Sequence, residues 1–229
     1  MPFGGNSALH ERLIMSLDGP RLAPLSGLKP DTLVVLIHGY GSNGEDLLSL
    51  GAAMQHSLPG AAFIAPNAPM LIPSLADAHQ WWAIETFSMA ERTAGADAAA
   101  PRLDTFLSTE LESAGLDSSR LLLVGFSQGA MLALHVGLRR ERAIAGIIGI
   151  SGMLVAPERL EKDICSRPPV LLIHGTDDDV VPFRSMEMAC AQLEAAGVPI
   201  TTHIAPGAGH WISPDGLETA IAFASQALA

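Results

Sequence analysis

Ser127 lies in the motif Gly-Phe-Ser-Gln-Gly at 125–129, where a serine could act as a nucleophile. The apolar run 121–124 before it predicts a buried strand, and residues 128–141 predict the following helix. A serine between glycines at such a junction is typical of a nucleophile elbow, a tight turn that lifts the hydroxyl above the sheet edge. The glycines avoid contact between side chains and neighbouring backbone. The alternative is an ordinary strand-to-helix turn with a serine cap.

A serine nucleophile needs a base that takes its proton and an acid that orients the base. Three adjacent aspartates follow the predicted strand 169–174, and His210 follows the predicted strand 200–204 in a glycine turn. This order of serine, acid and histidine is one of those found in serine hydrolases. Local chemistry leaves Asp177 and Asp178 as nearly equal candidates for the acid. The alternative readings are a solvated acidic turn and a capping or surface histidine.

Acyl transfer also needs two N–H donors for the developing oxyanion. We expect one to be the backbone N–H of Gln128, directly after the nucleophile. The other is expected at Tyr40, in the loop His-Gly-Tyr-Gly-Ser-Asn-Gly at 38–44. This loop lacks the Gly-Lys-Ser/Thr of a phosphate-binding loop, which argues against a nucleotide. Its alternative interpretation is a simple tight turn.

Other reactive side chains carry no catalytic pattern. His38 and His174 end predicted buried strands, so we expect them to make structural hydrogen bonds. No pair of histidines has the spacing of a metal site, and we expect neither a metal nor a cofactor. The chain has 2 cysteines, which excludes a disulfide framework, and Cys190 falls on an apolar helix face.

The elements that would position these residues alternate between strand and helix. Continuous apolar runs predict buried strands, and longer amphipathic stretches predict helices. This alternation predicts an α/β fold in three α/β/α layers, with a mostly parallel central sheet and helices on both faces. We expect a single domain over 1–229 and an edge strand or hairpin within 12–26. The strands are predicted at 32–38, 61–65, 120–126, 143–150, 169–174 and 200–204, and the helices at 45–56, 97–113, 128–141, 183–196 and 214–228.

The connection 66–95 has no clear period and is rich in proline, tryptophan and other apolar residues. Long loops in compact domains are usually functional or disordered, and two tryptophans make disorder improbable. We therefore predict a wall or lid over an apolar pocket. The alternative is a small hydrophobic cluster beneath a surface loop. The residues expected to contact the acyl group are Leu71, Ile72, Trp82 and Met153.

Composition limits the class of protein. The net charge of -11 argues against a nucleic-acid or anionic-membrane partner. No apolar run reaches the roughly 18 residues that span a bilayer. The first residues lack the basic and apolar regions of a secretory signal, so we expect a cytoplasmic protein without an integral membrane segment. A mean hydropathy of +0.31 favours a homodimer that covers apolar surface.

Taken together, the motifs resemble those of the phospholipase/carboxylesterase family, which includes bacterial carboxylesterases and acyl-protein thioesterases. The resemblance runs from about Leu33 to the C-terminus. It rests on His-Gly-Tyr-Gly at 38–41, the serine motif, His-Gly-x-x-Asp-x-Val-Val-Pro at 174–182 and Gly-His at 209–210. It implies the α/β-hydrolase fold, Ser127 as nucleophile, Asp178 as the acid, His210 as the base, and oxyanion donors at Tyr40 and Gln128.

Two segments depart from the family pattern. Relatives commonly carry Trp, an aromatic and then Asp where this chain has Trp-Trp-Ala-Ile-Glu at 81–85. The oxyanion loop reads Gly-Tyr-Gly-Ser-Asn-Gly instead of the Gly-Leu-Gly-Asp of the thioesterases. Both segments belong to the expected pocket wall, so substrate identity stays open.

The expected function is a serine carboxylesterase acting on small-molecule esters with short to medium acyl chains. The alternatives are a lysophospholipase or acyl-protein thioesterase and, more remotely, a non-catalytic hydrolase-like binding protein.

Overall fold

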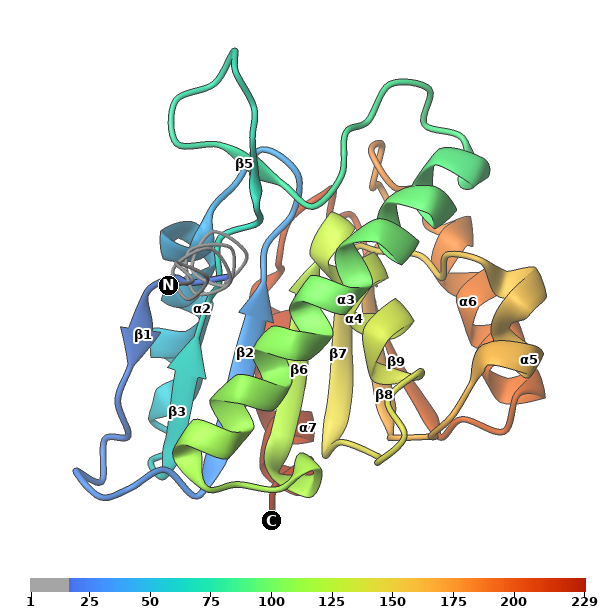
Figure 1. Ribbon diagram of the computed structural model, residues 1–229. Helices are drawn as coiled ribbons and strands as arrows, with labels where there is room; N and C mark the ends of the chain where they lie inside the picture. Colours follow the sequence, from blue (N-terminus) through green and yellow to red (C-terminus); the bar gives the residue numbers. More distant parts are fainter. Residues whose placement is uncertain (1–16) are drawn as a thin grey trace, which may run out of the picture.

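A seven-stranded sheet forms the centre of the protein in the computed structural model, which describes residues 17–229 (Figure 1). The strand order is β1-β3-β2-β6-β7-β8-β9. Neighbours from β3 to β9 pair in parallel, and β1 pairs antiparallel with β3 at one edge. The strands are β1 (Arg21–Leu22), β2 (Thr32–Ile37), β3 (Ala61–Ile64), β6 (Leu121–Phe126), β7 (Gly146–Ile150), β8 (Val170–Gly175) and β9 (Ile200–Ala205).

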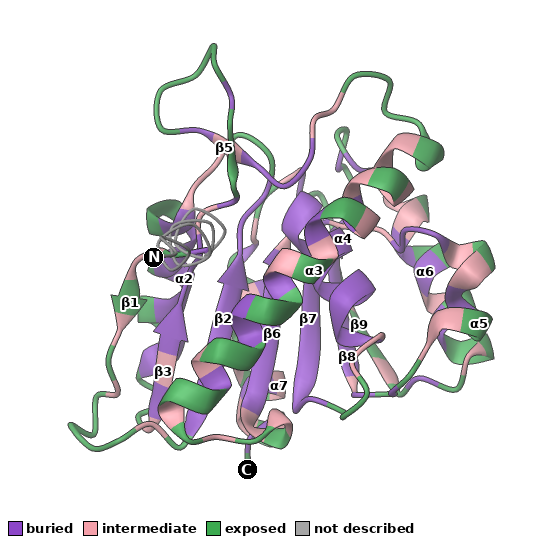
Figure 2. Cartoon of the chain, in the orientation of Figure 1, coloured by how far each residue is buried: buried purple, intermediate pink, exposed green. Residues whose placement is uncertain are grey.

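Helices cover both faces of this sheet, which confirms the predicted α/β layers. Helices α2 (Gly44–Gln55) and α7 (Pro214–Ala227) pack on one face. Helices α3 (Met89–Ala114), α4 (Gln128–Gly137) and α6 (Arg184–Ala195) pack on the other. The central strands are therefore buried on both sides, which explains their continuous apolar sequences (Figure 2). Short helices complete the fold: η1 (Ser118–Arg120), η2 (Pro157–Arg159) and α5 (Leu160–Asp163).

Because the strands are parallel, the loops that follow them gather at one edge of the sheet. The loops after β2, β6, β8 and β9 lie at the carboxyl ends of adjacent or nearby strands. Ligands bind at this edge in open α/β sheets. The topology therefore brings together four segments that are far apart in the sequence.

The segment 66–95 contains more regular structure than its sequence predicted. Strands β4 (Met70–Leu71) and β5 (His79–Gln80) form an antiparallel hairpin that projects beyond the sheet (Figure 1). Helix α3 begins at Met89, eight residues before the predicted start at 97. The sequence carried a signal for this start, because Ser88 and Glu91 have the spacing of a capping box. The Ser88 side chain accepts a hydrogen bond from the Glu91 N–H at 3.2 Å.

Two other expectations need qualification. The predicted helix 128–141 ends at Gly137, and the chain turns before β7. The edge element predicted within 12–26 appears as β1, while residues 12–16 lie outside the described part of the chain. No helix in residues 17–229 is long and apolar enough to cross a membrane.

Candidate active site

Ser127 occupies a strained turn between β6 and α4. Its backbone angles are φ 53° and ψ −116°, in a region that a residue with a side chain rarely adopts. The surrounding sheet holds it there, since the Ser127 N–H donates to the Ile150 carbonyl of β7 at 2.9 Å. The serine has no side-chain capping role at the start of α4. This differs from an ordinary turn with a serine cap.

The two glycines of the motif are required by close packing of the backbone. A Cβ atom on Gly125 would lie 2.4 Å from the Gly129 carbonyl oxygen. A Cβ on Gly129 would lie 1.9 Å from the Ile37 carbonyl oxygen, at the end of β2. Both distances are far below van der Waals contact, and both involve backbone that cannot move aside. The turn therefore needs glycine at both positions.

Ser127, His210 and Asp178 form one hydrogen-bonded chain. The Ser127 Oγ lies 3.0 Å from His210 Nε2, and His210 Nδ1 lies 2.8 Å from Asp178 Oδ2. A carboxylate can only accept, so His210 donates from Nδ1 and leaves Nε2 to accept the serine proton. These residues come from the ends of β6, β8 and β9 and are separated by 83 and 32 positions.

Asp178 is held in place by its own loop. Its Oδ1 accepts hydrogen bonds from the N–H groups of Val180 at 3.0 Å and Val181 at 2.8 Å. Burial opposes the charged carboxylate, but the hydrogen bonds from His210 and Val181 outweigh it and hold the pKa of Asp178 below its usual range. Asp177, in contrast, is exposed and pairs with the hydroxyl of Thr176 at 2.8 Å.

Two buried histidines, His174 and His38, make the structural hydrogen bonds expected of them. His174 Nε2 donates to the Val181 carbonyl at 2.8 Å and lies 3.3 Å from Asp178 Oδ2. His38 donates from Nδ1 to the Gly39 carbonyl at 2.7 Å, and its Nε2 accepts from the Ala68 N–H at 2.9 Å. Burial lowers the pKa of His38 to about 4, so it is neutral at pH 7.

The loop that carries Tyr40 passes beside the nucleophile. A Cβ on Gly39 would lie 3.2 Å from the Ser127 Cβ, so the backbone there approaches the serine closely. Gln128 follows the serine directly and is buried. Its carboxamide accepts from the Trp81 N–H and donates to the Trp82 carbonyl, both at 2.9 Å. The residue before Tyr40 thus lies close to Ser127, and the Gln128 side chain joins the segment 81–82 to α4.

A pocket of about 310 Å³ opens at Ser127 and His210. Its other lining residues are mostly apolar and come from the Tyr40 loop, the segment 82–92, α4 and the loop after β8. They are Tyr40, Trp82, Ile84, Phe87, Arg92, Gln128, Met131, Val180 and Val181. The pocket can surround an apolar group next to the nucleophile.

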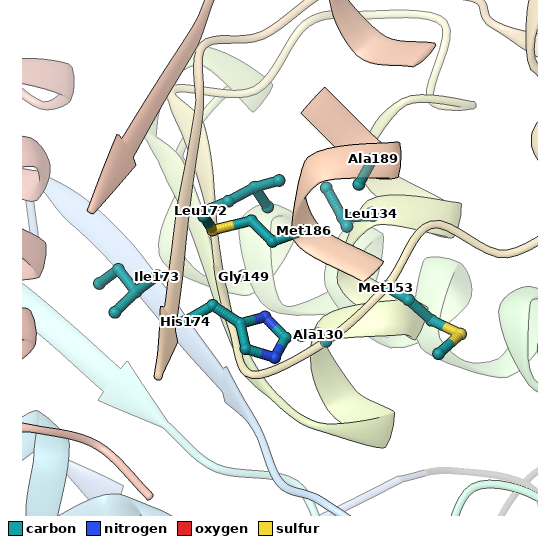
Figure 3. A pocket seen from close by; sticks show the side chains of 10 residues that line it. Ala130, Leu134, Gly149, Met153, Leu172, Ile173, His174, Met186 and Ala189 are labelled. Carbon is teal, nitrogen blue, oxygen red and sulfur yellow. The ribbon is translucent and has the colours of Figure 1, made fainter. Parts of the chain in front are cut away.

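The four residues expected to contact the acyl group are not gathered in this pocket. Trp82 lines it. Leu71 and Ile72 do not, because the β4–β5 hairpin carries them away: Leu71 is 63% exposed, and the Ile72 N–H donates to the Ala78 carbonyl at 2.8 Å. Met153 instead lines two neighbouring cavities, one of them a small space beside His174 (Figure 3).

Sequence reasoning missed several lining residues. Met131 lies four positions after Ser127 on α4, and this spacing places both on one side of the helix. Val180 and Val181 follow the acid in the same loop. Arg92 belongs to the part of α3 that was expected to be loop. Met131 could have been found from its spacing to Ser127, and Val180 and Val181 from their place directly after the candidate acid. Arg92 could be found only with the correct start of α3.

No three His, Cys, Asp or Glu side chains in residues 17–229 are grouped so that they could hold a metal ion. The chemistry that this arrangement can perform is proton transfer from Ser127 to His210 and attack by the serine oxygen on an electrophile in the pocket.

Comparison with known proteins agrees with these features. The phospholipase/carboxylesterase family profile matches residues 25–228. Acyl-protein thioesterase 1 homolog 1 of Dictyostelium discoideum is 28% identical over 203 residues, covering 85% of this chain and 90% of the relative. Acyl-protein thioesterase 1 of Gibberella zeae is 26% identical over 223 residues, covering 89% and 94%.

A solved structure is closer in sequence. The crystal structure of esterase PE8 is 46% identical to this chain, with a TM-score of 0.90, and the match covers 93% of this chain and 100% of that one. The fold is therefore that of the α/β-hydrolases, and the expected resemblance is confirmed. The chain belongs to the phospholipase/carboxylesterase family of hydrolases.

Proposed function

We propose that this protein is a serine carboxylesterase that hydrolyses carboxylic esters of short to medium acyl chains through an acyl-enzyme intermediate. The observation that carries the proposal is the hydrogen-bonded chain from Ser127 through His210 to the buried Asp178, placed at an apolar pocket. The esterase PE8, at 46% identity, supports the same chemistry.

In the first half-reaction, Ser127 Oγ attacks the ester carbonyl carbon while His210 Nε2 takes its proton. Asp178 holds the His210 tautomer and stabilises the imidazolium that forms. The tetrahedral intermediate then collapses, the carbonyl–alkoxide bond breaks, and His210 returns the proton to the departing alcohol. The serine is left as an ester of the acyl group.

In the second half-reaction, water attacks the acyl-enzyme carbonyl and His210 again takes the proton. Collapse of this intermediate releases the carboxylic acid and restores the serine hydroxyl. The backbone N–H groups of Tyr40 and Gln128 are proposed to bind the oxyanion in both steps. The close approach of the Tyr40 loop to Ser127 supports this role.

The preference for short to medium acyl chains is supported by the size of the pocket, about 310 Å³. Apolar pockets separate chain lengths weakly, by about 1–3 kcal/mol per methylene. We therefore expect activity over a range of small esters.

The test is the initial rate on p-nitrophenyl esters from acetate to palmitate for the wild type and Ser127→Ala. We expect a maximum at short or medium chains that disappears in the variant, with unchanged thermal unfolding. Ser108→Ala, on the exposed side of α3, is the matched control and should retain full activity. Turnover retained by folded Ser127→Ala would refute the proposal. A wild type inactive on every ester would favour the binding-protein alternative.

A second candidate is hydrolysis of thioesters or lysolipids. Thioesters are favoured by the two relatives named acyl-protein thioesterase, which are 28% and 26% identical to this chain, and lysolipids by the phospholipases named in the family description. The same serine would attack a thioester carbonyl and expel a thiolate. Relative kcat/KM values on a short ester, an S-acylated peptide and a lysophospholipid distinguish the candidates.

A further inference from the structure

The pocket beside Ser127 contains one arginine among its lining residues. Arg92 lies in the first turns of α3 and lines the same pocket as Ser127 and His210. Apart from His210, the remaining lining side chains are apolar or uncharged. A permanent positive charge is therefore placed within an apolar site that also holds the nucleophile.

The chain builds the surroundings of Arg92 with several hydrogen bonds. The Glu91 carboxylate turns back and accepts from the N–H groups of Glu85 at 3.0 Å and Thr86 at 2.6 Å. These bonds join the preceding segment to the start of α3, and Phe87, which lies between them, has a φ of 56°. Arg92 Nη1 donates to the Phe87 carbonyl, and its guanidinium carbon lies 6.0 Å from the centre of the Phe87 ring. Arg92 is half-buried, and both of these contacts are with Phe87 of the pocket wall.

Within residues 17–229, no carboxylate forms an ion pair with Arg92. Ion pairs with carboxylates are formed there by Arg21, Arg139, Arg140 and Arg159. The three acidic side chains nearest in sequence are otherwise placed, and one of them, Asp97, pairs with Arg159 and His135. Glu91 directs an oxygen at backbone N–H groups, and Glu85 is exposed. A guanidinium beside apolar groups gains most from an anion that enters the same space. The Phe87 carbonyl engages only part of its fork of N–H donors.

We infer that the pocket selects ester substrates that carry a carboxylate, which Arg92 binds. The inference rests on the proposed esterase activity and names the substrate class for the same site. A guanidinium matches a carboxylate in charge and in its paired hydrogen bonds, and such bonds strengthen where water is partly excluded. The aromatic and aliphatic lining would hold the carbon chain that joins the carboxylate to the scissile ester.

The test compares pairs of esters in which one member has a methyl group where the other has a carboxylate. On the acyl side, the pairs are p-nitrophenyl hexanoate with the p-nitrophenyl half-ester of adipic acid, heptanoate with pimelate, and octanoate with suberate. On the alcohol side, the pair is 4-methylphenyl acetate with 4-acetoxybenzoate. Each kcat/KM is divided by the hydroxide-catalysed rate of the same ester. We expect the wild type to favour the carboxylate member by about tenfold on at least one side of the ester.

Variants of Arg92 test whether this residue causes the preference for the carboxylate member. Arg92→Gln should remove it while neutral esters stay good substrates, Arg92→Lys should retain part of it, and Arg92→Glu should reverse it. Arg142→Gln makes the same charge change at an exposed position in the loop after α4 and should leave the preference unchanged. Thermal unfolding of each variant checks the fold.

Two results would overturn the inference. One is a wild type with no preference on either side of the ester. The other is an Arg92→Gln variant that keeps the preference, or one in which kcat/KM falls equally for both members of each pair. In the latter case Arg92 would only position Phe87. The proposed esterase activity is judged separately, by whether Ser127→Ala abolishes hydrolysis of the neutral esters.

Discussion

The carboxylate of Asp178 differs from its neighbours in what surrounds it. It accepts from two backbone N–H groups and from His210, whereas Asp177 is exposed. We expect Asp178→Asn to lower kcat by about 10³–10⁴-fold, because an amide no longer enforces the His210 tautomer. Asp177→Asn should change kcat less than about twofold, since an exposed charge is largely screened. Equal losses in steady-state assays of the two variants would contradict this assignment.

The same carboxylate predicts a pH dependence of stability. The folded-state pKa of Asp178 is lowered, so its contribution is fully present above the unfolded value of about 3.9. It is lost as the pH falls below that value and through the folded-state pKa. We expect the difference in unfolding free energy between wild type and Asp178→Asn to shrink as urea titrations move from pH 5 towards pH 3. A difference that grows over this range would be the contrary result.

At this scale the structure brings the three candidate triad residues within hydrogen-bond distance of one another, whereas three of the four residues expected at the acyl group do not line the pocket at Ser127. Ser127 and His210 follow from motif and order, because a nucleophile and its base occupy defined positions after strands. Asp178 was separated from Asp177 only by family resemblance, since adjacent residues after a strand have the same local chemistry. Leu71 and Met153 were expected at the acyl group from their apolar character alone, which does not say where a hairpin or loop directs them.

At the scale of elements, helix α4 holds the pocket-wall segment 81–82 in place through the side chain of Gln128. The Gln128 carboxamide completes hydrogen bonds of Trp81 N–H and the Trp82 carbonyl, which are buried. We expect Gln128→Leu to lower the free energy of unfolding by about 2 kcal/mol or more, because two buried polar groups lose their partner. The KM for esters should rise as Trp82 loosens. Chemical denaturation and steady-state kinetics measure both effects.

The matched control for that variant is Gln226→Leu, on the exposed face of α7. It makes the same chemical change without touching the pocket wall and should leave stability within about 0.5 kcal/mol. A Gln128→Leu protein as stable as this control would show that the segment 81–82 is held by other contacts.

The turn at Ser127 also depends on the close approach of the start of α4 to the end of strand β2. We expect Gly129→Ala to prevent folding or to cost more than about 4 kcal/mol, because its methyl group would overlap the Ile37 carbonyl of the neighbouring strand. Gly115→Ala, at the end of α3, meets no atom within 4 Å and should cost only about 1 kcal/mol from its φ of 68°. Expression yield and circular dichroism distinguish the two.

The strands were predicted closely because apolar runs in a parallel sheet are nearly continuous. The start of α3 was not, because Gly95 and Thr93 weaken the helical pattern there while Ser88 and Glu91 supply the capping contacts that fix it. Helix ends depend on individual capping bonds, which a periodic pattern does not show.

At the scale of the whole molecule, several large apolar side chains are exposed, among them Phe87, Val180, Met188 and Trp211. Together with the mean hydropathy of +0.31, they support the expectation of a homodimer. Light scattering coupled to size exclusion should give about twice the chain mass of 23.9 kDa. A mass equal to one chain across the micromolar range would rule it out.

The β4–β5 hairpin has a practical consequence for protein engineering. Its tip at 73–77 is exposed, and this segment reaches the pocket only at Trp82. Before that point the His79 N–H donates to the Ser42 carbonyl and the Trp81 N–H donates to the Gln128 carboxamide. The Asp77 carbonyl accepts from Asn43 of the Tyr40 loop at 3.2 Å, so a peptide tag or a small reporter module should be inserted at 73–75, away from this contact and from the candidate active site. The enzyme could carry such cargo, or be tethered to a surface through it, while its substrate entrance stays unobstructed.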